Sequence, residues 1–89
     1  MKRVHVYYSG RVQGIGFRFA AEDVARALGV KGWVKNLPDS RVEIVAEADE
    51  SVLEDFLSKL NTYFAGNITD TDINRENARG EFNDFHIAL

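Results

Sequence analysis

The 89-residue chain has no cysteine, which excludes a disulfide framework, a thiolate metal site and a cysteine nucleophile. Histidine is nearly as scarce: His5 and His86 lie near opposite ends and form no ligand-spacing motif, so no histidine metal site is expected. No apolar run approaches the length of a membrane span, and Met-Lys-Arg leads directly into a strand pattern rather than a signal peptide. We therefore expect a cytoplasmic protein without a membrane partner, metal or cofactor.

The composition is that of one globular domain covering residues 1–89. Apolar residues make up 45% of the chain and charged residues 28%, and a chain of this length supports a single core. The net charge of −3 is unevenly distributed: residues 1–41 carry eight Lys and Arg against three acids, and residues 42–89 carry three against eleven. The basic half favours a small anion, whereas the acidic half argues against a nucleic-acid partner.

Periodicity predicts five strands and two helices. Apolar alternation predicts strands over 3–9, 30–36, 41–48 and 67–76 and from Phe85 to the C-terminus, and helical spacing predicts helices over 17–28 and 50–64. Gly29 is placed to end the first helix, and Leu37-Pro38-Asp39-Ser40 predicts a type I turn. In strand 41–48 the alternation sends Val42, Ile44 and Ala46 inward and Arg41, Glu43 and Glu47 outward.

The order β-α-β-β-α-β predicts a two-layer α+β sandwich of the ferredoxin-like type. In this fold we expect an antiparallel sheet with both helices on one face. Because the fold hosts enzymes, RNA binders, metal carriers and regulatory modules, it does not by itself name a function.

Residues 10–18, Gly-Arg-Val-Gln-Gly-Ile-Gly-Phe-Arg, follow the first strand and lead into the first helix. Glycines at such a junction let backbone N–H groups converge on an anion near the positive end of the helix dipole. Arg18 at the helix start opposes that dipole, which suggests an anion bound between it and the loop. Neither a Walker-type loop nor a dinucleotide fingerprint fits this spacing. A plain tight turn, and a solvated Arg18, remain open alternatives.

The side chains available limit the chemistry. With no Ser-His-Asp set and no thiol, an enzyme built on this loop must need little acid–base or covalent help. Hydrolysis of an acyl phosphate meets that condition, because the carboxylate leaves without being protonated. The attacking water needs a polar, uncharged partner, and Asn36 at the end of the second strand is the candidate. A purely structural role for Asn36 at the strand end also remains open.

Two segments carry a specific resemblance. Residues 10–18, together with Gly32-Trp33-Val34-Lys35-Asn36, resemble the two signatures of the acylphosphatase family, and the likeness extends over nearly the whole chain. It implies that Arg18 and Asn36 are catalytic, Arg18 clamping the phosphate and Asn36 orienting water. It also implies that the phosphate is held by the backbone of Gln13, Gly14, Ile15, Gly16, Phe17 and Arg18.

The expected substrate is therefore a small acyl phosphate, with inorganic phosphate as product and inhibitor and the substrate's own phosphate oxygen as proton acceptor. The sequence departs from the family pattern mildly. Ile15 stands where valine is usual, and Ser40 where the hairpin commonly has glycine, so the turn geometry is expected to differ.

Two other interpretations of the function remain open. A non-catalytic binding module of the same fold, for RNA or protein, would need aromatic platforms on the central strands, for which Tyr7 and Tyr8 are the candidates. The chain is also conceivable as the acylphosphatase-like module of a larger carbamoyl-transfer protein. Because it begins at methionine, we expect a free-standing, monomeric enzyme.

Overall fold

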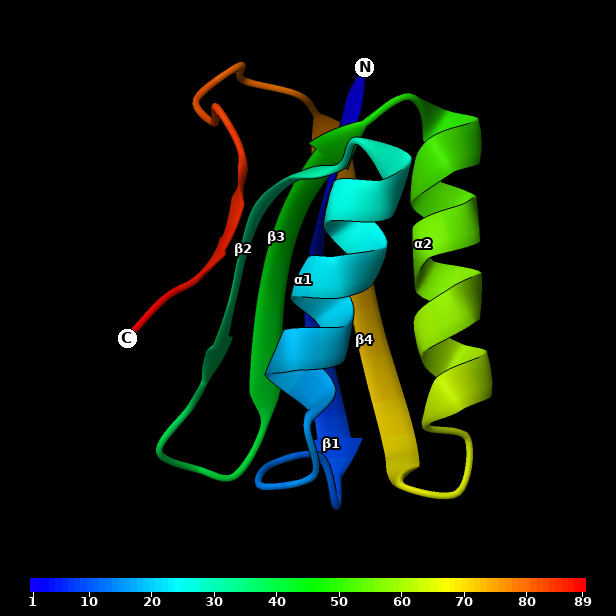
Figure 1. Ribbon diagram of the computed structural model, residues 1–89, viewed down its shortest axis with the longest axis vertical. Helices are drawn as coiled ribbons and strands as arrows, with labels where there is room; N and C mark the ends of the chain where they lie inside the picture. The colour runs from blue at the N-terminus through cyan, green and yellow to red at the C-terminus, as the bar shows by residue number, and fades with distance from the viewer.

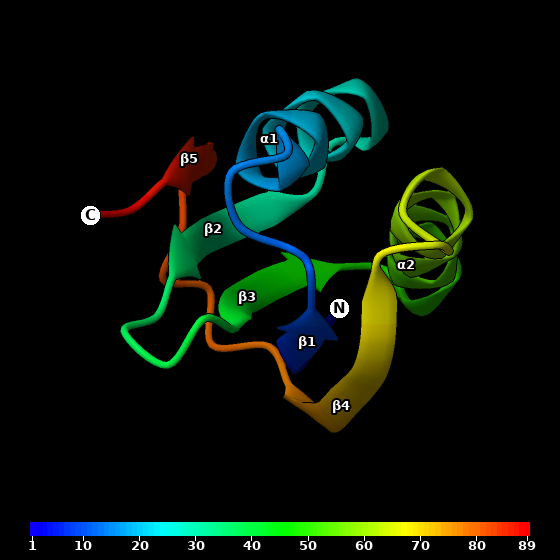
Figure 2. The same ribbon diagram turned by 90° about the horizontal axis from the view of Figure 1, so that it is seen from below.

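The structure, a computed structural model, describes all residues 1–89 and has two layers (Figures 1 and 2). Both helices cover the same face of one five-stranded sheet, as the sequence predicts. The helices are α1 (Phe17–Leu28) and α2 (Glu50–Tyr63). The strands are β1 (Lys2–Gly10), β2 (Lys31–Asn36), β3 (Val42–Ala48), β4 (Ile68–Asn77) and β5 (Phe85–Ile87).

The sheet order is β4-β1-β3-β2-β5, and one pairing differs from the prediction. The four longer strands pair antiparallel, but β5 runs parallel to β2, so the sheet is mixed rather than wholly antiparallel. After β4 the chain crosses to the far edge of the sheet and turns back before it enters β5. Strand β5 therefore runs in the same direction as β2 (Figure 1). The expected final strand is also shorter, because β5 ends at Ile87 and Leu89 is fully exposed.

An aromatic cluster in the core positions the start of α1. Phe17, the first residue of α1, is buried between Tyr8 of β1 and Phe64, with ring centroids 5.0 and 4.7 Å away. At the other end of α1, Gly29 adopts φ 75° and donates its N–H to the carbonyls of Ala25 and Arg26, which confirms the predicted helix end. Both ends of α1, and with them the loop before it, are therefore fixed against the sheet.

A β-bulge explains a conflict of parity in β4. Ile68 and Ile73 stand an odd number of residues apart, yet both pack against the core. The register between β1 and β4 shifts between Ser9 and Gly10, so that one residue of β4 is left out of the alternation. The bulge returns Ile68 to the face that carries the helices.

The face of the sheet away from the helices holds a buried ion pair, which the sequence did not predict. Glu47 points away from the helices as expected, but it is buried rather than exposed. Its carboxylate accepts hydrogen bonds from Arg3 Nε at 2.8 Å and from the N–H groups of Arg79 and Gly80 at 2.8 and 3.1 Å. Burial alone would raise the pKa of Glu47, but these donors hold it below its ordinary value. The segment after β4 thus folds back over the sheet.

Neither helix combines the length and apolar character needed to cross a bilayer.

Candidate active site

The loop between β1 and α1 has the backbone conformation that its glycines predict. Gly14 and Gly16 adopt φ 75° and 82°, in the left-handed region that other residues resist. A Cβ atom at either position would meet no neighbouring atom, so the backbone angles, rather than crowding, call for glycine. Gly16 is the N-cap of α1, and its carbonyl accepts the first helical hydrogen bond, from Ala20 at 3.0 Å.

The peptide N–H groups of this loop are free. Those of residues 13–18 donate to no backbone or side-chain oxygen of the chain. The first turn of α1 also contains no acidic residue that could occupy its positive end. Six consecutive donors, in the loop and at the start of α1, are thus available to a bound anion.

Arg18 has no acidic partner within the protein. Among the seven arginines, only Arg11 and Arg18 form no ion pair with a carboxylate, and both belong to the loop segment. Arg18 is half-buried, whereas Arg11 is exposed. The Arg18 guanidinium can therefore offer its donors to an anionic ligand.

One pocket brings the loop, Arg18 and Asn36 together. It measures about 240 Å³, smaller than the sites of drug-sized ligands, which take roughly 300–1,000 Å³. Asn36 ends β2, and its amide oxygen Oδ1 is buried without any hydrogen-bond partner in the chain. A buried amide oxygen is costly to leave unpaired, so this atom is available to a small donor such as water. The lining residues are Val12, Gly14, Gly16, Phe17, Arg18, Phe19 and Asn36.

The side chain of Gln13 connects the loop to the β2–β3 hairpin. Its amide Nε2 donates to the carbonyl oxygens of Leu37 at 2.8 Å and Arg41 at 2.9 Å. Leu37 directly follows Asn36, so these bonds fix the hairpin end relative to the loop. Sequence reasoning assigned only the backbone of Gln13 and missed this side chain. Its partners lie 24 and 28 residues away, beyond the reach of any local pattern.

The hairpin turn holds Ser40 in a backbone conformation that favours glycine. Ser40 N–H donates to the Leu37 carbonyl at 3.2 Å, and Leu37 N–H donates to the Arg41 carbonyl at 2.8 Å, so the predicted turn is confirmed. Ser40 adopts φ 78°, the one positive φ outside glycine, which explains why glycine suits this position. Serine takes the left-handed conformation here, and the expected difference from a turn with glycine stays a prediction. Next to it, hydrogen bonds from Arg41 lower the pKa of Asp39.

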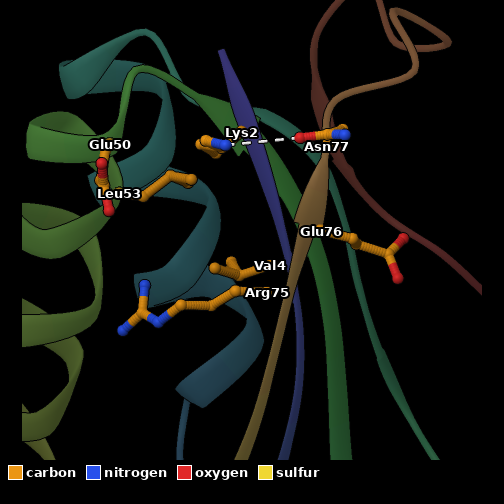
Figure 3. A pocket seen from close by; sticks show the side chains of 7 residues that line it. All are labelled: Lys2, Val4, Glu50, Leu53, Arg75, Glu76 and Asn77. Carbon is orange, nitrogen blue, oxygen red and sulfur yellow. Dashed lines mark hydrogen bonds between the residues drawn. The ribbon is translucent and has the colours of Figure 1, made fainter.

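A second pocket, of about 450 Å³, lies at the opposite end of the sheet, near the N-terminus of α2 (Figure 3). Its cations are already engaged: Lys2 bonds to Asn77 at 3.3 Å and Arg75 pairs with Glu54 at 2.7 Å. Glu76, which also borders it, points to the other side of the sheet in Figure 3. No group of three or more His, Cys, Asp or Glu side chains is arranged to hold a metal. The pocket beside the first β–α connection is therefore the stronger candidate.

The fold and this pocket define a small α+β domain with unpaired cationic and N–H donors at its first β–α connection. A sequence model of the acylphosphatase family matches residues 4–87. An acylphosphatase from Methylococcus capsulatus is 43% identical over 89 residues, covering 98% of this chain and 96% of the relative. For some other relatives the match spans only about half of the relative's length.

Solved structures agree with the sequence relatives. The crystal structure of acylphosphatase from Bacillus subtilis superposes with a TM-score of 0.90 and 31% identity, covering 100% of both chains. The structure of HypF from T. kodakarensis has a TM-score of 0.84 and 30% identity; the match covers 100% of this chain but 12% of HypF. The chain belongs to the acylphosphatase family, and it is an enzyme of that family.

Proposed function

We propose that this enzyme hydrolyses the carboxyl–phosphate bond of small acyl phosphates through the pocket of Arg18 and Asn36. The observation that carries the proposal is the combination of free groups there: unbonded N–H groups over residues 13–18, an unpaired Arg18 and an unpartnered Asn36 oxygen. A doubly charged phosphoryl group can bind to the N–H groups and to Arg18, and a water molecule can donate a hydrogen bond to the Asn36 oxygen.

In the proposed reaction the loop N–H groups and the Arg18 guanidinium bind the phosphoryl oxygens and offset their charge. Asn36 Oδ1 accepts a hydrogen bond from the water and directs its oxygen at phosphorus, opposite the leaving carboxylate. The new P–O bond forms as the bond to the carboxylate oxygen breaks, and the electron pair leaves with the carboxylate. The water proton passes to a phosphate oxygen of the substrate. Positioning and electrostatics therefore supply the catalysis.

A direct assay of benzoyl phosphate hydrolysis tests this proposal. Arg18→Gln should lower kcat/KM by at least about 100-fold and abolish inhibition by inorganic phosphate. Arg11→Gln is the matched control, because it removes the same charge from the other unpaired arginine, which does not line the pocket. Asn36→Ala should lower kcat to a similar degree yet keep phosphate inhibition. Equal losses in Arg11→Gln and Arg18→Gln would refute the assigned clamp. Activity should not change when a chelator is added.

The open face of the sheet bears on the RNA-binding alternative. Tyr8 lies in the core, so of the two expected platform residues only Tyr7 remains on this face. Arg41 Cζ lies 4.6 Å from the centre of the Tyr7 ring, and Lys35 Nζ lies 5.6 Å from that of Trp33. Because the protein's own cations occupy these rings, the face is poorly suited to stacking bases. This supports the enzymatic function; a gel shift with single-stranded RNA at low salt tests the alternative.

The HypF match favours a second candidate, in which this domain works inside a larger assembly, since the same fold occupies a small part of that chain. The two candidates differ in what the domain does alone. A free-standing enzyme releases carboxylate and phosphate in stoichiometric amounts without added protein.

A monomeric state and a cytoplasmic location stay predictions, which gel filtration and cell fractionation test.

A further inference from the structure

An exposed phenylalanine borders the proposed phosphate pocket. Apart from the terminal Met1 and Leu89, the large apolar side chains that the fold leaves exposed are Ile15, Phe19 and Tyr63. Phe19 has 65% of its surface accessible and Ile15 has 38%. These two residues flank the end of the loop, on either side of Gly16, Phe17 and Arg18.

Folding does not account for Phe19. The side of α1 that packs on the sheet consists of Phe17, Ala21, Val24 and Ala25, all of them buried, and Phe19 lies outside this stripe. Its ring therefore gains little from the core, and any polar residue would serve the helix equally well. Phe19 nonetheless lines the pocket together with Gly14, Gly16, Arg18 and Asn36.

We propose that Phe19 forms an apolar wall of this pocket that holds the acyl group of the substrate. This inference rests on the proposed function and adds the substrate class. The wall favours aromatic and branched aliphatic acyl phosphates over acetyl phosphate and over the polar carbamoyl phosphate.

The connectivity of the substrate supports this arrangement. In an acyl phosphate a single bridging oxygen separates the acyl carbon from phosphorus, so a phosphoryl group bound at the loop holds the acyl group at the edge of the same small pocket. The polar groups there are matched to the phosphoryl oxygens. Of the three apolar residues that line the pocket, Val12 and Phe17 are buried, so Phe19 offers the exposed apolar surface for the other half of the molecule. A flat or branched apolar group gains contact with a phenyl ring, and a methyl or an amide gains much less.

The test compares kcat/KM for benzoyl, acetyl and carbamoyl phosphates. In wild-type protein benzoyl phosphate should be the preferred substrate. Phe19→Ala should reduce the benzoyl-to-acetyl ratio roughly 3- to 10-fold, the size expected for one aromatic contact, and Phe19→Leu should reduce it less. The inhibition constant of inorganic phosphate should stay within about twofold, because the N–H groups and Arg18 remain. Since Phe19 is exposed, its variants should fold.

Tyr63→Ala is the matched control. It removes an aromatic ring of similar exposure, 61%, that borders a separate groove between the two helices. It should leave the ratio as it is in wild-type protein. A ratio unchanged in Phe19→Ala, with all the substrates still hydrolysed, overturns this inference and leaves the proposed function standing. If wild-type protein hydrolyses none of the three, the proposed function is wrong and the inference falls with it.

Discussion

Replacing Gln13 with methionine tests whether the link between loop and hairpin matters for catalysis. Methionine keeps the length and much of the shape of glutamine but donates no hydrogen bond. The substitution therefore removes the bonds from Nε2 to the carbonyls of Leu37 and Arg41. Both carbonyls also accept backbone N–H bonds within the turn, so neither is left without any partner.

The magnitude follows from those two bonds. A hydrogen bond of this kind contributes about 1 kcal/mol net, so Gln13→Met should cost about 2 kcal/mol of unfolding free energy. For a domain of this size that is roughly 8–15 °C in Tm. The hairpin end that carries Asn36 is then free to move relative to the loop. A displacement of about 1 Å at a reacting group can cost up to roughly 100-fold in rate.

The assay separates positioning from stability. Activity is measured at a temperature where circular dichroism shows Gln13→Met to be folded. Because the free N–H groups and Arg18 remain, inhibition by inorganic phosphate should persist while kcat falls by about 10-fold or more. Gln13→Glu should be worse still, since its carboxylate would face two carbonyl oxygens.

A double-mutant cycle gives the decisive result. If Gln13 acts by holding Asn36 in place, Gln13→Met should lower kcat little further once Asn36 is already alanine. Additive losses in the double variant would refute the reasoning, as would a loss of stability with kcat unchanged. Ser51→Ala, on the exposed surface of α2, provides a baseline for both measurements.

Three further predictions concern stability, each measured by urea denaturation. Glu47→Gln should cost about 3 kcal/mol at pH 7, because it removes the closest and most buried of the three carboxylates that pair with the buried Arg3. The fold lowers the pKa of Glu47 from 4.5, so the unfolded chain binds this proton more tightly than the folded chain does. The unfolding free energy of wild-type protein should therefore fall as the pH drops below about 4.5, and that of Glu47→Gln should fall less. The same pH dependence in both proteins would contradict this. Ser40→Gly should raise stability by up to about 1 kcal/mol by relieving its positive φ, and a decrease would disprove the strain. Phe56→Ala should cost roughly 3–5 kcal/mol through a core cavity, and a loss below about 1 kcal/mol would contradict its place in the core.

Local patterns in the sequence predicted much of this fold. Apolar alternation and helical spacing are set by side chains that face one core, so they revealed each strand and helix to within a few residues of its ends. Gly29 was predicted to end α1 because helices often end at a glycine in the left-handed conformation. Arg18 and Asn36 came from chemistry and from the family resemblance, and the pocket that contains both is consistent with that expectation.

Features that depend on distant contacts could not be predicted. The burial of Glu47 depends on residues 79 and 80 folding back over the sheet, and that polar segment carries no periodicity. The parallel pairing of β5 depends on which edge remains free after four strands have paired. The donors of Gln13 likewise have partners that only the tertiary structure brings near.

The position of β4 at the edge of the sheet has a consequence for solubility. One side of this ten-residue strand pairs with no other strand and could template association with another molecule. Asp70, Asp72, Arg75 and Glu76 line the strand, and their charges repel or misalign an incoming chain. At acidic pH, protonation of Glu47 weakens its hydrogen bonds to the N–H groups of Arg79 and Gly80, and the segment after β4 loses its anchor beside this edge. Acid is therefore the condition under which intermolecular β-pairing should begin, and β4 is where it should start.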